Sequence, residues 1–311
     1  MAGVLETVDQ RTQLVGENRL ELLMFTLRCK QVYAINVFKV QEVQKMPKLT
    51  LIPNRNPLVA GVTHVRGQTI PVIDLSLAIQ RGKLTDVENC NVIISEYNRT
   101  IQAFMVGGVD RIVNMNWDEI SPPPLGTGKD HFLTAITKFE NEIVEILDVE
   151  KVLSQINAYD TKISEGVLDD DIKTLASGLR VLLADDSPIA LSQAKNVLEQ
   201  LGLEVVTVTD GAKALERLKK WAAEGFDFEK DLLMLVTDAE MPEMDGYMLT
   251  SAIRQDDRLQ NIHVVLHTSL SGEFNLAMVD KVGCNDFISK FQPDTLGELC
   301  QTLIKKKRGV Q

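Results

Sequence analysis

Four short stretches of sequence decide the fold of the second half of the chain: VLLADDS (181–187), LVTDAEMPEMDG (235–246), VVLHTS (264–269) and FISK (287–290). Each is an apolar run of the kind that forms a buried parallel strand, and each carries polar side chains at or just after its end. The strands of an open α/β sheet present their carboxyl ends together, so the loops that follow them converge on one pocket. We therefore expect one group of side chains to surround a single point: Asp185, Asp186, Asp238, Thr268 and Lys290.

The residue types in this pocket indicate phosphoryl chemistry. Clustered carboxylates repel one another and are costly to remove from water unless a cation lies among them. Hard oxygen ligands from few protein groups suit Mg²⁺, which keeps several waters and adds phosphate oxygens. Taken singly, Asp185 and Asp186 are also consistent with a helix N-cap, Asp238 with a turn carboxylate and Lys290 with a solvated surface lysine. Their joint position at successive strand ends favours phosphoryl transfer onto a carboxylate.

Residues 179–308 resemble a response-regulator receiver domain. The resemblance rests on the acidic pair, the motif D-x-x-M-P-x-M-D-G from Asp238, the threonine at a strand end, and an aromatic residue three positions before the lysine. It implies a flavodoxin-like α/β fold with a five-stranded parallel sheet. Receivers usually have proline after the lysine, whereas Phe291 stands here. The loop after Lys290 is therefore expected to take a different shape.

The receiver resemblance also implies a role for each matching residue. The phosphoacceptor is Asp238, and the Mg²⁺ ligands are Asp185, Asp186, Asp238 and the backbone carbonyl of Glu240. Lys290 pairs with the phosphoryl oxygens, and the switch pair that reports phosphorylation is Thr268 and Phe287.

Length and composition are those of an ordinary globular protein of two domains, with 311 residues, 44% hydrophobic and 25% charged. No apolar run approaches the ~20 residues that span a bilayer, and the polar N-terminus lacks a signal-peptide core. The four cysteines lack metal or redox spacing. The net charge of −11 leaves no basic footprint for nucleic acid. The basic run 305–308 is interpreted as a complement to the dipole of a final helix. We expect a cytoplasmic protein that neither inserts into the membrane nor binds nucleic acid.

Residues 18–157 consist of short apolar-rich segments between proline and glycine turns. Several segments alternate with the period of a half-buried strand, among them VYAINVFKV (32–40), TIPVIDL (69–75) and NVIISEY (91–97). Many short strands at such spacing are typical of small antiparallel barrels. The segments contain neither a nucleophile–histidine pairing nor metal-ligand spacing, so we expect a binding module rather than an enzyme.

Several stretches of this first half resemble the CheW family of chemotaxis coupling proteins: NVFKVQEV (36–43), GVTHVRGQTIPVIDLS (61–76), WDEISPPP (117–124) and VEILDVEKVL (144–153). The resemblance implies two SH3-like barrels side by side. It further implies one edge that binds the regulatory domain of the histidine kinase CheA, and a groove that binds the cytoplasmic tips of chemoreceptors. Five positions match those implicated in receptor or kinase coupling: Val40, Glu42, Gly61, Arg66 and Gly67.

Simpler interpretations of these partner-binding candidates stay open. Val40 and Gly61 are also consistent with core packing and a turn, and Glu42 with a solvated charge at a strand edge. A charged side chain beside apolar strands needs an acidic partner. Arg66 is therefore expected to pair either within its own domain or with another protein.

Residues 158–178 are predicted to be mostly an exposed connector, because they mix acidic and polar side chains with glycines. VLDDDIKTLAS (167–177) is expected to form a helical turn or two. A CheW-like module at 18–157 followed by a receiver at 179–308 resembles the CheV type of chemotaxis coupling protein.

The CheV resemblance implies an adaptor at membrane-associated chemoreceptor arrays, which catalyses only its own phosphorylation and dephosphorylation. The phosphodonor domain of CheA is expected to phosphorylate Asp238 and so regulate coupling, and CheW is a further candidate partner. The alternative is a phosphate sink, in which the first domain anchors a receiver that drains phosphoryl groups from CheA.

Overall fold

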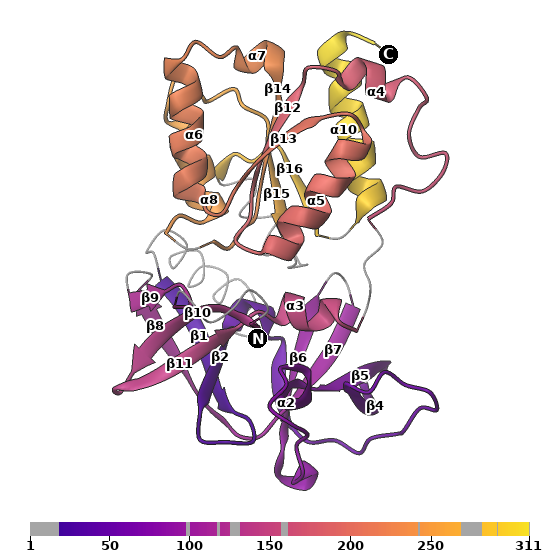
Figure 1. Cartoon of the computed structure of the whole chain (residues 1–311), viewed down its shortest axis with the longest axis vertical. Coiled ribbons are helices and arrows are strands. Elements are labelled where there is room, and N and C mark those ends of the chain that lie inside the picture. Colours follow the sequence, from indigo (N-terminus) through magenta and orange to yellow (C-terminus); the bar gives the residue numbers. More distant parts are fainter. Residues whose placement is uncertain are drawn as a thin grey trace, which may run out of the picture. The chain divides into compact units, whose positions relative to one another are not determined.

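A computed structural model describes residues 19–97, 100–116, 119–124, 131–156, 161–241, 243–268, 282–290 and 292–310. The chain forms two compact units, Arg19–Ala158 and Tyr159–Gln311, which we call the N-terminal and C-terminal units (Figure 1). Across these described ranges, no helix is both long and apolar enough to cross a bilayer.

The N-terminal unit is built from two β-sheets. The first has the strand order β8 (Val109–Asn116), β1 (Arg19–Thr26), β2 (Val32–Asn36), β11 (Glu142–Leu147), β10 (Leu133–Phe139) and β9 (Ile120–Ser121). The second has the order β3 (Glu42–Lys45), β6 (Asn91–Tyr97), β7 (Thr100–Val106), β5 (Gln68–Asp74) and β4 (Val59–Val65). Short helices fill the connections: η1 (Val37–Lys39), α2 (Leu75–Ala78), η2 (Val87–Asn89) and α3 (Val149–Ser154).

The prediction of an all-β unit is confirmed, with one difference in strand direction. Most neighbouring strands are antiparallel, but β2 pairs with β11 and β5 pairs with β7 in parallel. Successive side chains of a strand point to opposite faces of its sheet. In β1, Leu20, Leu22 and Met24 belong to the core of the first sheet, and Leu23 and Phe25, on the other face of the strand, are buried as well.

The C-terminal unit has a five-stranded parallel sheet with the order β13 (Glu204–Val208), β12 (Arg180–Ala184), β14 (Leu232–Thr237), β15 (Val264–Thr268) and β16 (Asp286–Ser289). This order and the parallel direction confirm the predicted flavodoxin-like α/β fold. The central strand β14 is buried at every position, as expected of an apolar run covered on both faces.

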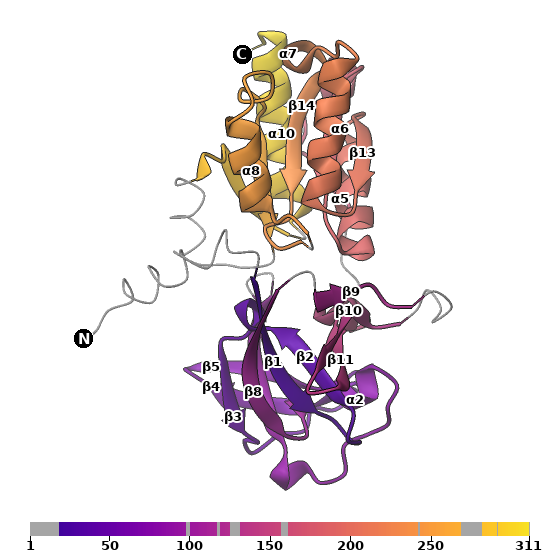
Figure 2. The ribbon, with the colours of Figure 1, turned by 90° about the vertical axis from the view of Figure 1, so that its left-hand side faces the viewer.

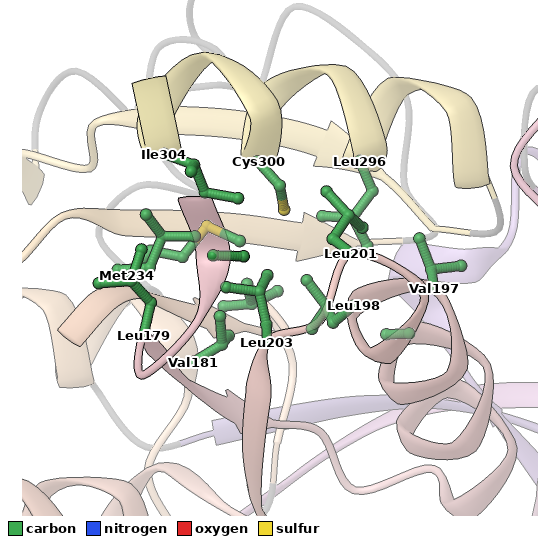
Figure 3. Packing of buried hydrophobic residues seen from close by; sticks show 14 of the residues in the cluster. Leu179, Val181, Val197, Leu198, Leu201, Leu203, Met234, Leu296, Cys300 and Ile304 are labelled. Carbon is green, nitrogen blue, oxygen red and sulfur yellow. The ribbon is translucent and has the colours of Figure 1, made fainter. Parts of the chain in front are cut away.

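Helices cover both faces of this sheet (Figures 1 and 2). On one face lie α5 (Pro188–Gln200) and α10 (Pro293–Arg308), and on the other lie α6 (Gly211–Ala223) and α8 (Gly246–Arg254). The short helix α7 (Phe228–Asp231) precedes β14. Figure 3 shows Leu296, Cys300 and Ile304 of α10 directed at the sheet, as the spacing of one helix face requires.

Residues 161–178, which we call the strap, pack against the C-terminal unit. The expected helical turn is present as α4 (Ile172–Ala176), and both terminal residues of this helix are buried in the apolar cluster beneath α5 and α10. Much of the strap's surface faces solvent, as predicted, but its backbone and side chains bind residues of α5 and α10. The strap is therefore part of the C-terminal unit rather than a free connector.

Three of the four basic residues that end α10 bind other residues of the C-terminal unit. Lys305 forms an ion pair with Asp169 of the strap. The Lys307 ammonium donates to the carbonyl oxygen of Leu232 at 2.6 Å, and Arg308 donates to the carbonyl oxygens of Leu175 and Ser177 at 2.8 and 2.7 Å. The run does end the final helix, as interpreted, but the partners of these cations lie on β14 and on the strap rather than among the carbonyls of α10 itself.

Candidate functional site

The acidic residues predicted to share a pocket lie together at the carboxyl edge of the parallel sheet. Asp185 and Asp186 follow β12, and Asp238 follows β14, the neighbouring strand. Each offers one carboxylate oxygen, and these oxygens lie within 4.8 Å of one another. Asp185 and Asp238 are only 1% and 6% exposed, so their charges are held largely out of water.

Lys290 supplies a cation to this cluster. It follows β16 and is 1% exposed. Its ammonium lies 2.7 Å from Oδ2 of Asp185 and 2.8 Å from Oδ2 of Asp238. A buried charge is tolerated only when it is paired, and here one ammonium faces two carboxylates. The cluster therefore keeps a net negative charge and attracts a further cation.

The carboxylates are the right donors for that cation. Hard oxygen ligands from a few residues, with room for water and phosphate oxygens, are the coordination environment of Mg²⁺. Asp185, Asp186 and Asp238 fit this description by residue type and by spacing. The carbonyl of Glu240, in the loop that leads to α8, stays a predicted fourth ligand.

Backbone groups hold the acidic side chains in position. The Ser187 N–H donates to Oδ1 of Asp185 at 2.9 Å, and the Asp238 N–H donates to the carbonyl oxygen of Ala184 at 2.8 Å. A Cβ at Gly246, the first residue of α8, would collide with the carbonyl oxygen of Asp238. Sequence reasoning overlooked Gly246 as a site residue, although it stands in the D-G pair that starts a helix.

The two predicted switch residues lie on the neighbouring strands β15 and β16. Thr268 ends β15 and is 1% exposed, and its carbonyl oxygen accepts a hydrogen bond of 2.9 Å from the Lys290 N–H. Phe287 is half-buried beside Leu266, its partner in the strand register. The positions suit a switch pair, which stays a prediction, and Phe291 lies outside the described residues.

Tyr247 of α8 was not among the predicted site residues, yet it packs in the same small cluster as Phe287. Burial, reinforced by the carboxylate of Glu240, raises the pKa of its phenol. Burial likewise raises the pKa of Asp245, although the Met248 N–H that this carboxylate caps lowers it. No sequence pattern indicates that a tyrosine on the apolar face of a helix will lie beside the pocket.

In the N-terminal unit, two of the candidate partner-binding residues form an ion pair. A guanidinium nitrogen of Arg66 contacts a carboxylate oxygen of Glu42, and Gln44 also donates to Glu42. The interpretation that Arg66 pairs within its own domain is therefore confirmed for this structure. The pair joins β3 to the β4–β5 hairpin, and the Arg66 side chain remains 71% exposed.

The remaining candidates in this unit have local structural roles. Arg66 and Gly67 form the β4–β5 turn with φ of 48° and 83°, a conformation that favours glycine. A Cβ at Gly61 would lie 2.9 Å from the carbonyl oxygen of Thr50. Glycine is therefore required where the segment of Thr50 passes this close to β4. Val40 is half-buried and follows η1, and its N–H donates to the carbonyl oxygen of Val37 at 2.9 Å.

Comparison with known proteins matches both halves of the chain. Residues 21–157 match the CheW-like domain family and residues 181–302 the response regulator receiver domain family. Chemotaxis protein CheV1 of Helicobacter pylori is 30% identical over 98% of this chain and 99% of its own length. CheV3 of the same organism is 30% identical over 88% and 89%. The solved structure of the scaffolding protein TtCheW from Thermoanaerobacter tengcongensis is 28% identical, over 41% of this chain and 83% of its own, with a TM-score of 0.38. With a CheW-like domain followed by a receiver domain, and a match along nearly its whole length, this chain belongs to the CheV family of chemotaxis coupling proteins.

Proposed function

We propose that the N-terminal unit couples chemoreceptors to the histidine kinase CheA, and that phosphorylation of Asp238 by CheA regulates this coupling. One observation carries the proposal: a buried Asp238, which shares the ammonium of Lys290 with Asp185, lies in the same chain as a CheW-like domain. The chain is then an adaptor at cytoplasmic receptor arrays, bound to the regulatory domain of CheA and to receptor tips, with CheW as a neighbour.

The phosphoryl group comes from a phosphohistidine on the phosphodonor domain of CheA. A carboxylate oxygen of Asp238 attacks the phosphorus, a P–O bond forms as the P–N bond breaks, and the bonding electron pair returns to the histidine nitrogen. Lys290 orients Asp238 before the transfer and pairs with a phosphoryl oxygen after it. When bound by Asp185, Asp186, Asp238 and the Glu240 carbonyl, Mg²⁺ supplies positive charge to the transferred group.

Phosphorylation changes the charge that faces the switch residues. A dianionic phosphoryl group with three acceptor oxygens replaces a carboxylate. In our proposal the Thr268 hydroxyl donates to one of these oxygens, and Phe287 turns into the space that the threonine leaves. The altered surface then acts on the partner contacts of the N-terminal unit, for which Val40, Glu42, Gly61, Arg66 and Gly67 stay the candidates.

The test is CheA activity in reconstituted receptor arrays that contain this protein, with and without Mg²⁺ and acetyl phosphate. Asp238→Asn removes the phosphoacceptor, and Asp257→Asn, at an exposed position beyond α8, is the matched control. We expect phosphorylation to change kinase activity with the wild type and with Asp257→Asn, but not with Asp238→Asn. Equal activity in all conditions, with phosphate still taken up at Asp238, would reject regulation and favour the phosphate sink.

A further inference from the structure

The strap has two halves that are held to the C-terminal unit in different ways. Its second half contains α4, whose Ile172 and Ala176 are 2% and 0% exposed within the apolar cluster. Its first half, residues 161–168, contributes only the partly buried side chains of Ile163 and Leu168 to that cluster. Local opening follows the weakest contacts, so the first half opens more readily than α4.

Hydrogen bonds fasten the first half to α5 and α10. Gln200 of α5 donates to the carbonyl oxygen of Thr161 at 2.6 Å and accepts from the Ile163 N–H at 3.3 Å. Ser164 donates twice to Asp294 of α10, from its N–H to Oδ1 at 2.7 Å and from its hydroxyl to Oδ2 at 2.8 Å. These two bonds lower the pKa of Asp294, so its carboxylate stays ionised and both bonds persist at neutral pH.

Helix α10 has a glycine where it contacts the first half of the strap. Gly297 lies in the interior of this helix, where glycine is unfavourable compared with alanine. A Cβ at Gly297 would lie 3.1 Å from Cδ1 of Ile163 and 3.5 Å from Cδ2 of Leu168. The glycine thus leaves the space that the first half of the strap occupies.

Asp294, which accepts the hydrogen bonds from Ser164, is close in sequence to Lys290 of the proposed phosphorylation site. Asp294 is in the first turn of α10, and Lys290, which directly follows β16, lies four residues before it. The Lys290 ammonium is now shared between Asp185 and Asp238. A phosphoryl group on Asp238 places its oxygens farther out, and the lysine that pairs with them shifts. Since hydrogen bonds weaken steeply over a shift of about 1 Å, the paired Ser164–Asp294 bonds respond to movement of this junction.

We propose that residues 161–168 form a latch that phosphorylation of Asp238 opens, while α4 stays docked. The tether that leads from the N-terminal unit to the C-terminal unit then extends to residue 169 rather than to residue 161, and is longer. Because effective concentration depends on linker length, the receiver thereby controls how freely the two units meet a common partner. This inference rests on the proposed phosphorylation of Asp238.

Hydrogen exchange of the full-length protein tests the latch, with Mg²⁺ and beryllofluoride as the phosphoryl mimic. When beryllofluoride is bound, we expect the backbone N–H groups of Ile163 and Ser164 to exchange roughly tenfold faster, because a pair of hydrogen bonds is lost. Exchange in α4 should stay unchanged. Asp238→Asn removes this response. Asp294→Ala, which removes both acceptor oxygens of Ser164, gives fast exchange without the mimic, whereas Glu298→Ala, at an exposed carboxylate of the same helix, behaves as the wild type. Unchanged exchange in β12 and β14 shows that each variant is folded.

The outcomes separate the latch from the proposed function. A bound beryllofluoride signal in the fluorine NMR spectrum with unchanged exchange at residues 163–164 overturns the latch and leaves phosphorylation of Asp238 standing. Wild-type exchange in Asp294→Ala also overturns the latch, because the hydrogen bonds to Asp294 then do not hold residues 163–164. Absence of bound beryllofluoride in the wild type with Mg²⁺ rejects the phosphorylation site itself and the latch with it.

Discussion

Glu42 and Arg66, which the sequence pattern indicated separately as partner-binding residues, form an ion pair with each other across β3 and the β4–β5 hairpin. Their side chains are 21% and 71% exposed, so the arginine can still reach a partner. An exposed pair of this kind contributes about 0–1 kcal/mol to folding. The pair therefore has little value for stability, and its charges are compatible with the proposed role in partner recognition.

Arg66→Ala is expected to weaken coupling in receptor arrays while changing the thermal midpoint by no more than a few degrees. The reason is that the variant removes an exposed charge but no packing. Arg111→Ala is the control, since Arg111 is also exposed and paired, with Asp110 and Glu140. Kinase activity and calorimetry check both variants, and a large loss of stability in Arg66→Ala would contradict this view.

Lys290→Ala leaves two buried carboxylates without their shared cation. Breaking a buried pair in this way typically costs about 3–5 kcal/mol, so we expect a much lower free energy of unfolding in the absence of Mg²⁺. Added Mg²⁺ should restore part of that loss, because it places a cation among the same oxygens. Denaturant titration with and without Mg²⁺ measures the difference, with Lys195→Ala as the exposed control. An equal loss in both conditions would argue against a metal at these carboxylates.

Gly297→Leu in α10 is expected to displace the strap, since a larger side chain fills the space of Ile163 and Leu168. Gly297→Ala should be nearly neutral, because the gain of about 0.5–1 kcal/mol in helix propensity is offset by the contact with Ile163. Limited proteolysis within residues 161–168 reports the displacement. If Gly297→Leu is cut no faster than Gly297→Ala, the glycine does not serve the strap.

His263 makes the stability of the C-terminal unit depend on pH. Burial lowers its pKa, although Asp286, 2.7 Å from its Nε2, opposes the shift, and Lys306 and Arg254 add to it. The unfolded chain therefore binds this proton more readily than the folded one. The stabilisation is complete above the ordinary pKa of about 6.5 and is lost as the pH falls through the folded value.

The His263→Gln variant is accordingly expected to lose less stability than the wild type between pH 7 and pH 5. Calorimetry of the full-length protein at several pH values measures the two slopes. His64→Gln, at an exposed histidine of the N-terminal unit, should keep the wild-type slope. Parallel curves for wild type and His263→Gln would show that other groups govern the acid response.

The acidic pocket of the C-terminal unit was predictable because its residues are tied to strand ends. Asp185, Asp238 and Lys290 each end an apolar run, and parallel strands bring such ends together whatever the loop details. The Glu42–Arg66 pair was not predictable as a pair, since it depends on how β3 approaches the β4–β5 hairpin. No local pattern encodes that approach.

The docking of the strap onto the C-terminal unit could not be predicted from the sequence for a similar reason. Asp169 reads as one of three consecutive aspartates in an exposed run, and its partner Lys305 as one of several cations that end a helix. Gly297 weakens a helical pattern, and the residue that explains it, Ile163, lies far away in sequence. Contacts between distant segments are what single-sequence patterns leave out.

The buried face of α4 bears on how the receiver is best isolated. A fragment that starts at residue 179 leaves Ile172 and Ala176 behind and bares the apolar surface that they cover. Such a surface favours self-association, so this fragment is expected to be poorly soluble. A fragment that starts at residue 159 keeps Ile172 and Ala176, which cover this apolar surface. It is therefore the better choice for crystallisation and for phosphotransfer assays.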